Sequence, residues 1–213
     1  MNTVLHIGCG PTDLSHLPPL FHQGEWQEIR LDIDESVYPD IVASMLDMSI
    51  VEDGTVSAIY SSHNVEHLFP HEVPIALAEF RRVLRLDGVA VVKCPDVLSV
   101  AKAIVESESV ETTLYDSPSG PIAALDILYG HREALAEGNH FMAHKTAFTA
   151  RSLARALFGA GFQQVVVTRD VVFGLHALAY PELVSNERIQ KDCAGTIYSR
   201  EFNIETVVYT SND

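Results

Sequence analysis

The apolar run at residues 4–7 ends at the turn Gly8-Cys9-Gly10, and this junction constrains the fold more than any other segment of the chain. A short apolar run that stops at glycine predicts a buried strand, and glycine lets the backbone adopt positive φ and approach a ligand closely. A second strand is expected over 28–33, and it carries Asp32, 22 residues after Gly10. A carboxylate at that strand end can accept hydrogen bonds from the hydroxyls of a ribose. Together these features predict a nucleotide-like ligand at the ends of the first two strands.

Strands and helices alternate along most of the chain. The alternation predicts an α/β protein with a doubly wound, mostly parallel, seven-stranded Rossmann-like sheet that is covered on both faces. Helices are expected over 74–84 and, with Thr149 as N-cap, up to residue 158. The last two strands are close enough to pair as a terminal antiparallel hairpin. The expected strands are 4–7, 28–33, 41–42, 56–60, 89–93, 164–168 and 173–179.

Residues 97–148 interrupt this alternation after the fifth strand, and we expect a helical insertion there. We expect one domain over 1–180, with the insertion on its substrate side. The polar tail 181–213, with one more strand expected over 204–209, should pack on that domain or on a partner. The pieces expected in the insertion are a helix over 98–114, a turn-rich loop over 115–121, and short helices over 122–129 and 132–136.

The 213-residue chain carries a formal net charge of −15, from 14 Lys and Arg against 29 Asp and Glu. Such a surface repels a phosphate backbone, so we expect no nucleic-acid partner. No apolar run reaches the ~18 residues of a membrane span, and the N-terminus lacks a basic and apolar leader. The prediction is a cytoplasmic protein without membrane contact, and homodimer formation stays open.

The glycine turn lacks the third glycine of a dinucleotide-binding fingerprint, because Asp13 occupies that position. A helix then cannot pack as closely, which weakens a nicotinamide-dinucleotide site and favours an adenosyl group. Further along, Asp47 and Met48 could clamp an adenine edge through a carboxylate and a backbone N–H. The alternative for this pair is a solvated aspartate beside a core methionine.

Several short segments recur in a characteristic order and spacing. Together they resemble a class I S-adenosylmethionine-dependent methyltransferase of the small-molecule, methyltransferase-11-like type, over about residues 4–180. The segments are Leu-His-Ile-Gly-Cys-Gly (5–10), Leu-Asp-Ile-Asp (31–34), Leu-Asp-Met (46–48), Ser-Ser-His-Asn-Val-Glu-His-Leu (61–68), Glu-Phe-Arg-Arg-Val-Leu-Arg-Leu-Asp-Gly (79–88), Val-Ala-Val-Val-Lys-Cys-Pro-Asp (89–96) and Gly-Ala-Gly-Phe (159–162).

The resemblance implies S-adenosylmethionine as the cofactor and assigns its contacts by position. Two positions depart from the family pattern: His6 stands where an acidic residue is usual, and Thr12 where a third glycine is usual. The implied contacts are Gly8, Cys9 and Gly10 on the methionine part, Asp32 on the ribose, Ile33 beside the adenine, Asp47 and Met48 on the adenine edge, and Ser62 and His63 at the sulfonium end.

The motif His63-Asn-Val-Glu66-His67 allows three interpretations. It matches the inverted zinc-peptidase pattern, in which two histidines one helical turn apart share a metal and the glutamate acts as base. In the methyltransferase framework, Glu66 and His67 resemble a common Leu-Glu-His helix start, and some related O-methyltransferases bind a divalent metal with E-x-x-E-H here. We favour a structural or cofactor-edge role without a metal, and the metal-assisted transferase and the peptidase stay open.

The predicted function is methyl transfer to an oxygen or nitrogen of a small-molecule acceptor. An insertion after the fifth strand would overhang the sulfonium end and shape the acceptor pocket. A hydroxyl acceptor needs a general base, for which His63 and His144 are the candidates. A catalytically silent cofactor-binding scaffold remains an alternative function, because His6 and Thr12 differ from the residues usual in the family. The polar residues noted in the insertion are Tyr129, His131, His140, His144 and Lys145.

Overall fold

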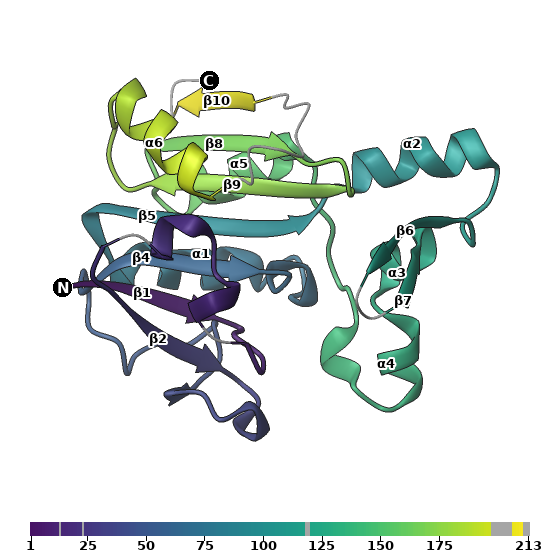
Figure 1. Ribbon diagram of the computed structural model, residues 1–213, viewed down its shortest axis with the longest axis horizontal. Coiled ribbons are helices and arrows are strands. Elements are labelled where there is room, and N and C mark those ends of the chain that lie inside the picture. The colour runs from purple at the N-terminus through teal and green to yellow at the C-terminus, as the bar shows by residue number, and fades with distance from the viewer. Residues whose placement is uncertain (13, 23, 118–119, 197–205, 211–213) are drawn as a thin grey trace.

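The structure is a computed structural model that describes residues 1–12, 14–22, 24–117, 120–196 and 206–210. Its centre, within those residues, is an eight-stranded sheet with the order β10-β8-β9-β5-β4-β1-β2-β3 (Figure 1). The neighbours from β5 to β3 are parallel, whereas β9 is antiparallel to both β5 and β8. The predicted sheet and its terminal hairpin are confirmed. The strands are β1 (Asn2–Ile7), β2 (Trp26–Asp32), β3 (Ile41–Val42), β4 (Val56–Ser62), β5 (Leu84–Pro95), β8 (Gln164–Arg169), β9 (Gly174–Tyr180) and β10 (Thr206–Thr210).

β10 extends the seven predicted strands by an eighth at the edge of the sheet. It pairs antiparallel with β8, so that Val208 lies opposite Val166. A strand was expected over 204–209, and its first two residues lie outside the described part of the chain.

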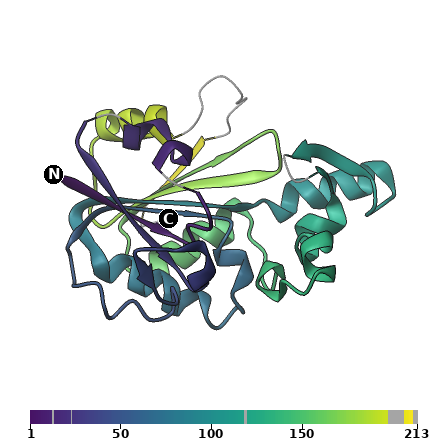
Figure 2. The ribbon, with the colours of Figure 1, turned by 60° about the horizontal axis from the view of Figure 1, so that its bottom comes forward.

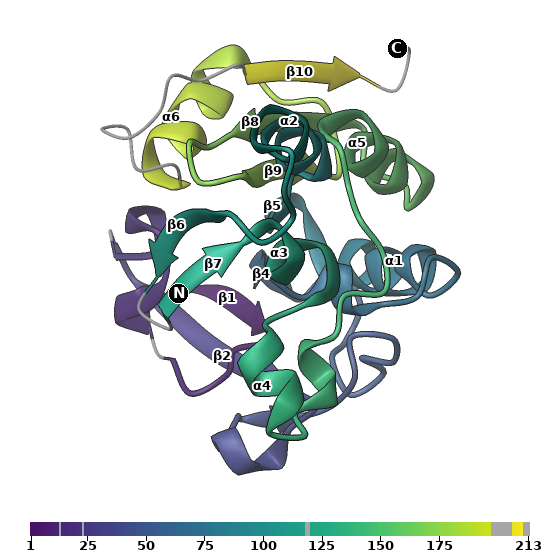
Figure 3. The ribbon, with the colours of Figure 1, turned by 90° about the vertical axis from the view of Figure 1, so that its right-hand side faces the viewer.

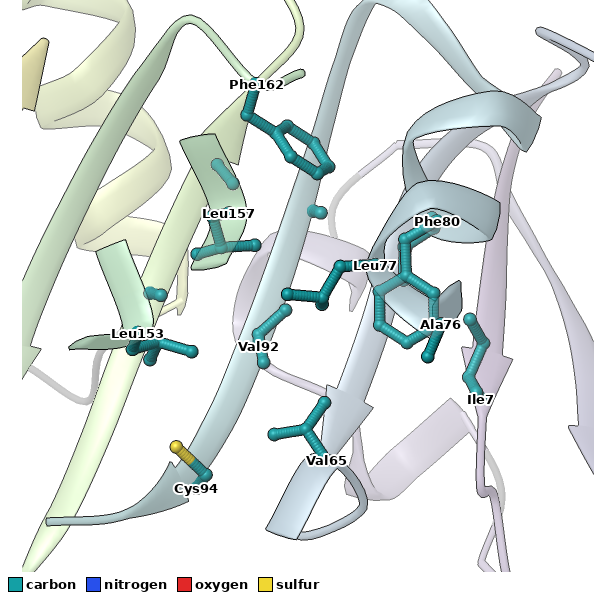
Figure 4. Close-up of a cluster of buried hydrophobic side chains, with 14 of the residues drawn as sticks. Ile7, Val65, Ala76, Leu77, Phe80, Val92, Cys94, Leu153, Leu157 and Phe162 are labelled. Carbon is teal, nitrogen blue, oxygen red and sulfur yellow. The ribbon is translucent and has the colours of Figure 1, made fainter. Parts of the chain in front are cut away.

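One face of the sheet is covered by α1 (Val73–Val83) and α5 (Ala150–Gly159). Figure 4 shows Leu77 and Phe80 of α1 and Leu157 of α5 pointing toward the sheet, where all three are fully buried. Burying a side chain of this size contributes roughly 1.5–3 kcal/mol. Both helices were predicted, and Thr149 caps α5 as expected by accepting a hydrogen bond from the Ser152 N–H at 3.2 Å.

The opposite face is covered by two 3-10 turns, Leu14–His16 and Pro19–His22, and by α6 (Asn186–Thr196) (Figure 2). Ile189 of α6 is buried in the same apolar cluster as Leu17, Phe21 of the second turn, and residues of the sheet. Helix α6 was not predicted, because its sequence is mostly polar and has no apolar stripe. This part of the tail packs on the sheet.

Residues 97–148 form a separate group beyond the carboxyl ends of the strands (Figures 1 and 3). They have a small apolar core of their own, in which Val100, Ile122, Ala124 and Ile127 are buried together. The elements are α2 (Val97–Ser107), the antiparallel pair β6 (Thr113–Ser117) and β7 (Gly120–Ala123), α3 (Ala124–Tyr129) and α4 (Arg132–Ala136).

The insertion is only partly helical, which corrects the sequence prediction. The helix expected over 98–114 ends at Ser107, and the next residue, Glu108, has φ 54°. A left-handed residue ends a helix, and the threonines and aromatic residue that follow favour an extended backbone. The helix expected over 132–136 is confirmed, whereas the helix expected over 122–129 begins only at Ala124. The described residues of the loop expected over 115–121 lie in the strands β6 and β7, which pair as a hairpin. No helix among the described residues has the length and apolar character of a membrane span.

Candidate cofactor and acceptor site

The glycine turn lies at the carboxyl end of β1, and both of its glycines have positive φ. Gly8 has φ 63°, and a Cβ added to it would lie 1.9 Å from Oδ1 of Asn64. The Asn64 amide is held there because its Nδ2 donates to the Ile7 carbonyl at 2.8 Å. Gly10 has φ 55°, but no atom of the described residues lies within 4 Å of its Cβ position. The turn therefore needs glycine at Gly8 for space, and it presents an open backbone surface at Gly10.

Two side chains of β2 hold this turn in place. The Gly10 N–H donates to Oδ2 of Asp32 at 2.8 Å, and the Asp34 N–H donates to Oδ1 at 3.0 Å. The Gly10 carbonyl accepts a hydrogen bond from Nη2 of Arg30 at 2.6 Å. Hydrogen bonds to charged groups are roughly twice as strong as neutral ones. The carboxylate predicted to hold a ribose is thus fixed beside the turn predicted to receive the ligand.

The two departures from the family pattern lie behind this surface. His6 is 4% exposed, and its Nδ1 lies 2.7 Å from Oε1 of Glu28 on the neighbouring strand. Burial lowers the pKa of His6, although Glu28 acts in the opposite direction, so the neutral ring donates Nδ1–H to the carboxylate. Thr12 closes the turn by donating its hydroxyl to the Cys9 carbonyl at 2.6 Å. Both residues support the turn from behind, while Asp13 lies outside the described residues.

A cavity of about 500 Å³ opens over the turn, which is within the range of sites that bind small ligands. It lies at the carboxyl ends of β1, β2 and β4, where such sheets bind ligands. The insertion, which Figure 3 shows in front of the strand ends, contributes Asn139, Phe141, Met142 and Lys145 to the lining of this cavity. Of the predicted cofactor contacts, the structure brings together Gly8, Gly10, Asp32, Ile33, Ser62 and His63.

Sequence reasoning missed several residues that line this cavity. Met45 and Leu46 precede the predicted adenine contacts by one or two positions. Phe141, Met142 and Lys145 come from the end of the insertion. The placement of the insertion over the site predicted that it would contribute residues, and Lys145 was noted among its polar residues, but nothing in the residue types identified Phe141 and Met142.

Three predicted cofactor residues lie elsewhere. Cys9 is buried, and burial raises the pKa of its thiol. Met48 is fully buried, and its N–H donates to Oε2 of Glu79 at 2.6 Å. Asp47 is exposed and accepts the Ser49 N–H at 3.1 Å. The described lining of the cavity includes none of them, so the adenine-edge role of Asp47 and Met48 stays a prediction.

Residues 5–92 match the family model of a methyltransferase domain. The structure also resembles a protein of Pyrococcus horikoshii, at 15% identity and a TM-score of 0.57, covering 84% of this chain and 82% of that one. A S-adenosylmethionine-dependent methyltransferase of Archaeoglobus fulgidus is 15% identical, with a TM-score of 0.54 and coverage of 84% and 85%. One of Methanosarcina mazei is 15% identical, with a TM-score of 0.55 and coverage of 86% and 93%. No curated protein matches the sequence at a significant level.

The fold is that of a class I S-adenosylmethionine-dependent methyltransferase. The resemblance predicted from the sequence is confirmed at the level of the fold, and the match of residues 5–92 to a methyltransferase-domain model agrees with S-adenosylmethionine as the cofactor. The cavity fits that group, because Gly10 has an open face, Asp32 offers a fixed carboxylate and Ile33 offers an exposed apolar surface.

His63 does not share a helix with His67. Val65–His67 form one 3-10 turn, and His63 precedes it with φ 57°. Such a conformation is uncommon for a residue other than glycine, and strained residues of this kind cluster at functional sites. The His63 side chain is 56% exposed, with Nδ1 3.2 Å from Oε1 of Glu66. The helical metal pair that a peptidase requires is not formed by these residues.

A different trio gathers behind His63. Glu66, His67 and His144 each have a potential ligand atom, and all three atoms lie within 4.8 Å of one another. The end of the insertion is held against the Glu66 segment because the N–H groups of Lys145 and Thr146 donate to the Glu66 carbonyl, at 2.8 and 3.2 Å. Sequence reasoning considered Glu66 and His67 as metal ligands together with His63, and it missed their association with His144, which belongs to the insertion.

The electrostatic state of the trio follows from its burial. Burial opposes ionisation of Glu66, but the hydrogen bond with His63 and the charges of His63 and His67 outweigh it and lower the pKa of the carboxyl. Burial lowers the pKa of His144, which favours its neutral ring. The trio thus combines a carboxylate at Glu66 with a neutral ring at His144. His144 is not among the described residues that line the cofactor cavity.

The other polar residues noted in the insertion lie away from this trio. Nδ1 of His131 accepts the Ala134 N–H at 3.4 Å and caps α4. His140 and Tyr129 are exposed. Their positions indicate a structural or solvent-facing role.

Proposed function

We propose that this methyltransferase domain is an active enzyme that transfers the methyl group of S-adenosylmethionine to an oxygen or nitrogen of a small-molecule acceptor. The observation that carries the proposal is the cavity of about 500 Å³, in which Gly10, Asp32 and His63 meet beneath the insertion. When bound, the cofactor supplies a methyl group on a positively charged sulfur, which is a good leaving group. The protein then has mainly to bind and align the two reactants.

The β1 and β2 ends would hold the cofactor. Asp32 would accept hydrogen bonds from ribose hydroxyls, in addition to the backbone N–H groups that fix it. Ile33 is 54% exposed and offers an apolar surface for an adenine ring, with Met45 and Leu46 on the same cavity wall. Asp47 and Met48 would act on the adenine edge only after a local rearrangement.

The acceptor would enter between the strand ends and the insertion. Phe141, Met142 and Lys145 line that side of the cavity, and Phe141 is 62% exposed. An aromatic face and a thioether suit an apolar small molecule. The net charge of −15 disfavours a nucleic-acid acceptor, and we propose a small cytoplasmic metabolite.

His63 is the better candidate for the general base. It lines the cavity, and Oε1 of Glu66 can hold its Nδ1–H, so that Nε2 keeps the lone pair. A base that is oriented by a carboxylate is a recurrent catalytic arrangement. His144 is the weaker candidate, because its Nδ1 is engaged with the Ile127 carbonyl at 2.6 Å.

The test is turnover. The purified chain would be incubated with S-adenosylmethionine and a panel of phenols, catechols and amines, and release of S-adenosylhomocysteine would be measured. We expect turnover with at least one acceptor class, and a fall in kcat of about 10²-fold for His63→Ala with a hydroxyl acceptor. His71→Ala, an exposed histidine outside the cavity, is the control.

A silent scaffold gives a different result. It would bind S-adenosylhomocysteine and show no turnover with any acceptor of the panel, which contradicts the proposed activity while leaving the cofactor site in place. If His63→Ala turns over the acceptor as fast as the unmodified protein does, His63 is not the general base.

A further inference from the structure

The geometry points to a divalent metal site formed by Glu66, His67 and His144, and we infer that the protein binds a transition-metal ion of the Zn²⁺ class there. The ligand atoms of these three residues lie within 4.8 Å of one another. Atoms that share a Zn²⁺ at about 2.0–2.2 Å lie about 3–4 Å apart. Ion binding therefore needs side-chain shifts of only about 1 Å. From the sequence alone we favoured a role of this motif without a metal and left a metal-assisted transferase open.

The two histidines are oriented as metal ligands are. Nδ1 of His67 lies 3.1 Å from the Ala143 carbonyl, and Nδ1 of His144 lies 2.6 Å from the Ile127 carbonyl. A carbonyl can only accept, so each ring carries its proton on Nδ1 and keeps a lone pair on Nε2. Metal-ligating histidines almost always donate their second ring nitrogen to a carbonyl or carboxylate in this way. The ring centroids are 4.9 Å apart, in an edge-to-face arrangement.

Glu66 supplies the strongest indication of a cation site. Its side chain is 1% exposed. One carboxylate oxygen, Oε1, is engaged with His63, while Oε2 is buried without a partner among the described residues. A buried polar oxygen left unpaired is unfavourable. A metal ion at the trio would satisfy Oε2 and leave the contact with His63 intact.

The chemistry of the ligands selects the class of ion. Two imidazoles and one carboxylate suit Zn²⁺ and similar divalent transition metals, whereas Mg²⁺ and Ca²⁺ prefer oxygen ligands alone. Three protein ligands leave at least one coordination position for water or another molecule, which is typical of a catalytic rather than a structural zinc site.

The position of the site links the insertion to the cofactor cavity. His67 lines that cavity as well as belonging to the trio. The open coordination position can therefore receive an acceptor oxygen, whose pKa a bound metal would lower. This role rests on the proposed methyl transfer, whereas the existence of the site rests on its ligands alone.

The experiment is a calorimetric titration of the chelator-treated 213-residue chain with ZnCl₂, without cofactor. We expect one equivalent to bind with a Kd below about 1 μM, and saturating Zn²⁺ to raise Tm by about 5 °C or more. Glu66→Gln keeps the shape of the side chain, and it should weaken binding by at least about 100-fold. His144→Asn should do the same. His140→Ala, an exposed histidine of the same insertion, should bind like the unmodified protein.

Two results would overturn the site: no saturable Zn²⁺ uptake by the unmodified protein, or equal affinity in Glu66→Gln and the unmodified protein. Circular dichroism checks that each variant is folded, and Glu66→Gln decides alone if His144→Asn does not fold. The turnover assay with S-adenosylmethionine and the acceptor panel separates this inference from the proposed function. Zn²⁺ binding without methyl transfer supports the site and contradicts the activity, and methyl transfer by a protein that takes up no Zn²⁺ does the reverse.

Discussion

The two sides of the cavity are built in different ways. The β1–β2 side is made of strand ends whose backbone groups are hydrogen-bonded to one another, as where the Gly8 and Cys9 N–H groups both donate to the Leu31 carbonyl. The insertion side is made of short helices, a two-stranded hairpin and a 3-10 turn, His140–Met142, with a small core of its own. If the β1–β2 side binds the cofactor and the insertion side binds the acceptor, as proposed, acceptor specificity could change without disturbing cofactor binding.

The largest expected effect lies on the cofactor side, at Gly8. Gly8→Ala would place a Cβ 1.9 Å from the Asn64 amide at a positive φ, so we expect it to destabilise the protein by about 3 kcal/mol or more. Gly10→Ala has the same kind of φ but open space around it, and should cost about 1 kcal/mol. Thermal unfolding measures both, and equal losses would contradict the distinction between the two glycines.

The second prediction concerns the core of the insertion. Asp126 is buried and accepts hydrogen bonds from Nε and Nη2 of Arg132, at 2.6 and 3.0 Å. Asp126→Asn should destabilise the insertion by about 1–3 kcal/mol. Hydrogen exchange should increase over 97–148 and stay unchanged in the central strands. The exposed Asp116→Asn on β6 is the control, and a uniform increase across the sheet would contradict two separately packed halves.

The same pair predicts a pH dependence. The hydrogen bonds from Arg132 lower the pKa of Asp126 to about 2, from its usual 3.8. Because the folded state holds the carboxylate more acidic, its contribution is present above about pH 4 and is lost as the pH falls toward 2. Acid unfolding followed by exchange of the insertion should show this loss, and Asp126→Asn should abolish it.

A smaller effect is expected at Phe141. Phe141→Ala removes an exposed aromatic side chain from the acceptor side of the cavity. We expect the KM for the acceptor to rise about 10-fold, which corresponds to about 1.4 kcal/mol, with Tm nearly unchanged. The affinity for S-adenosylhomocysteine should change by less than about 3-fold. A larger loss of affinity for the cofactor than for the acceptor would show that Phe141 contacts the cofactor, and it would contradict the division of the cavity into two sides.

The smallest effect is expected at Asp47. Its carboxylate is exposed and the described lining of the cavity excludes it, so Asp47→Ala should alter S-adenosylhomocysteine affinity by less than about 2-fold, because no contact is lost. Calorimetry measures this directly. A loss of 10-fold or more would instead support the adenine-edge role that the sequence predicts.

Features that neighbouring residues determine could be predicted from the sequence, whereas features that depend on contacts between distant segments could not. The glycine turn, the carboxylate of Asp32 and the N-cap at Thr149 are local signals, because neighbouring residues carry all of the information. Helix α6 escaped prediction because it packs mainly through Ile189 and carries a buried Asp192 bonded to the Tyr180 hydroxyl. The trio of Glu66, His67 and His144 joins two segments that are distant in sequence, and only the folded chain shows them together.

The central claim is that the glycine turn and Asp32 form an S-adenosylmethionine site. The most direct measurement is a calorimetric titration with S-adenosylhomocysteine of the unmodified protein and of Asp32→Ala, with Asp116→Ala as the matched control. We predict one binding site per chain, an affinity that falls by about 100-fold in Asp32→Ala because two charge-assisted hydrogen bonds are lost, and no change in the control. Absence of binding to the unmodified protein, or equal affinity in Asp32→Ala, would contradict the account.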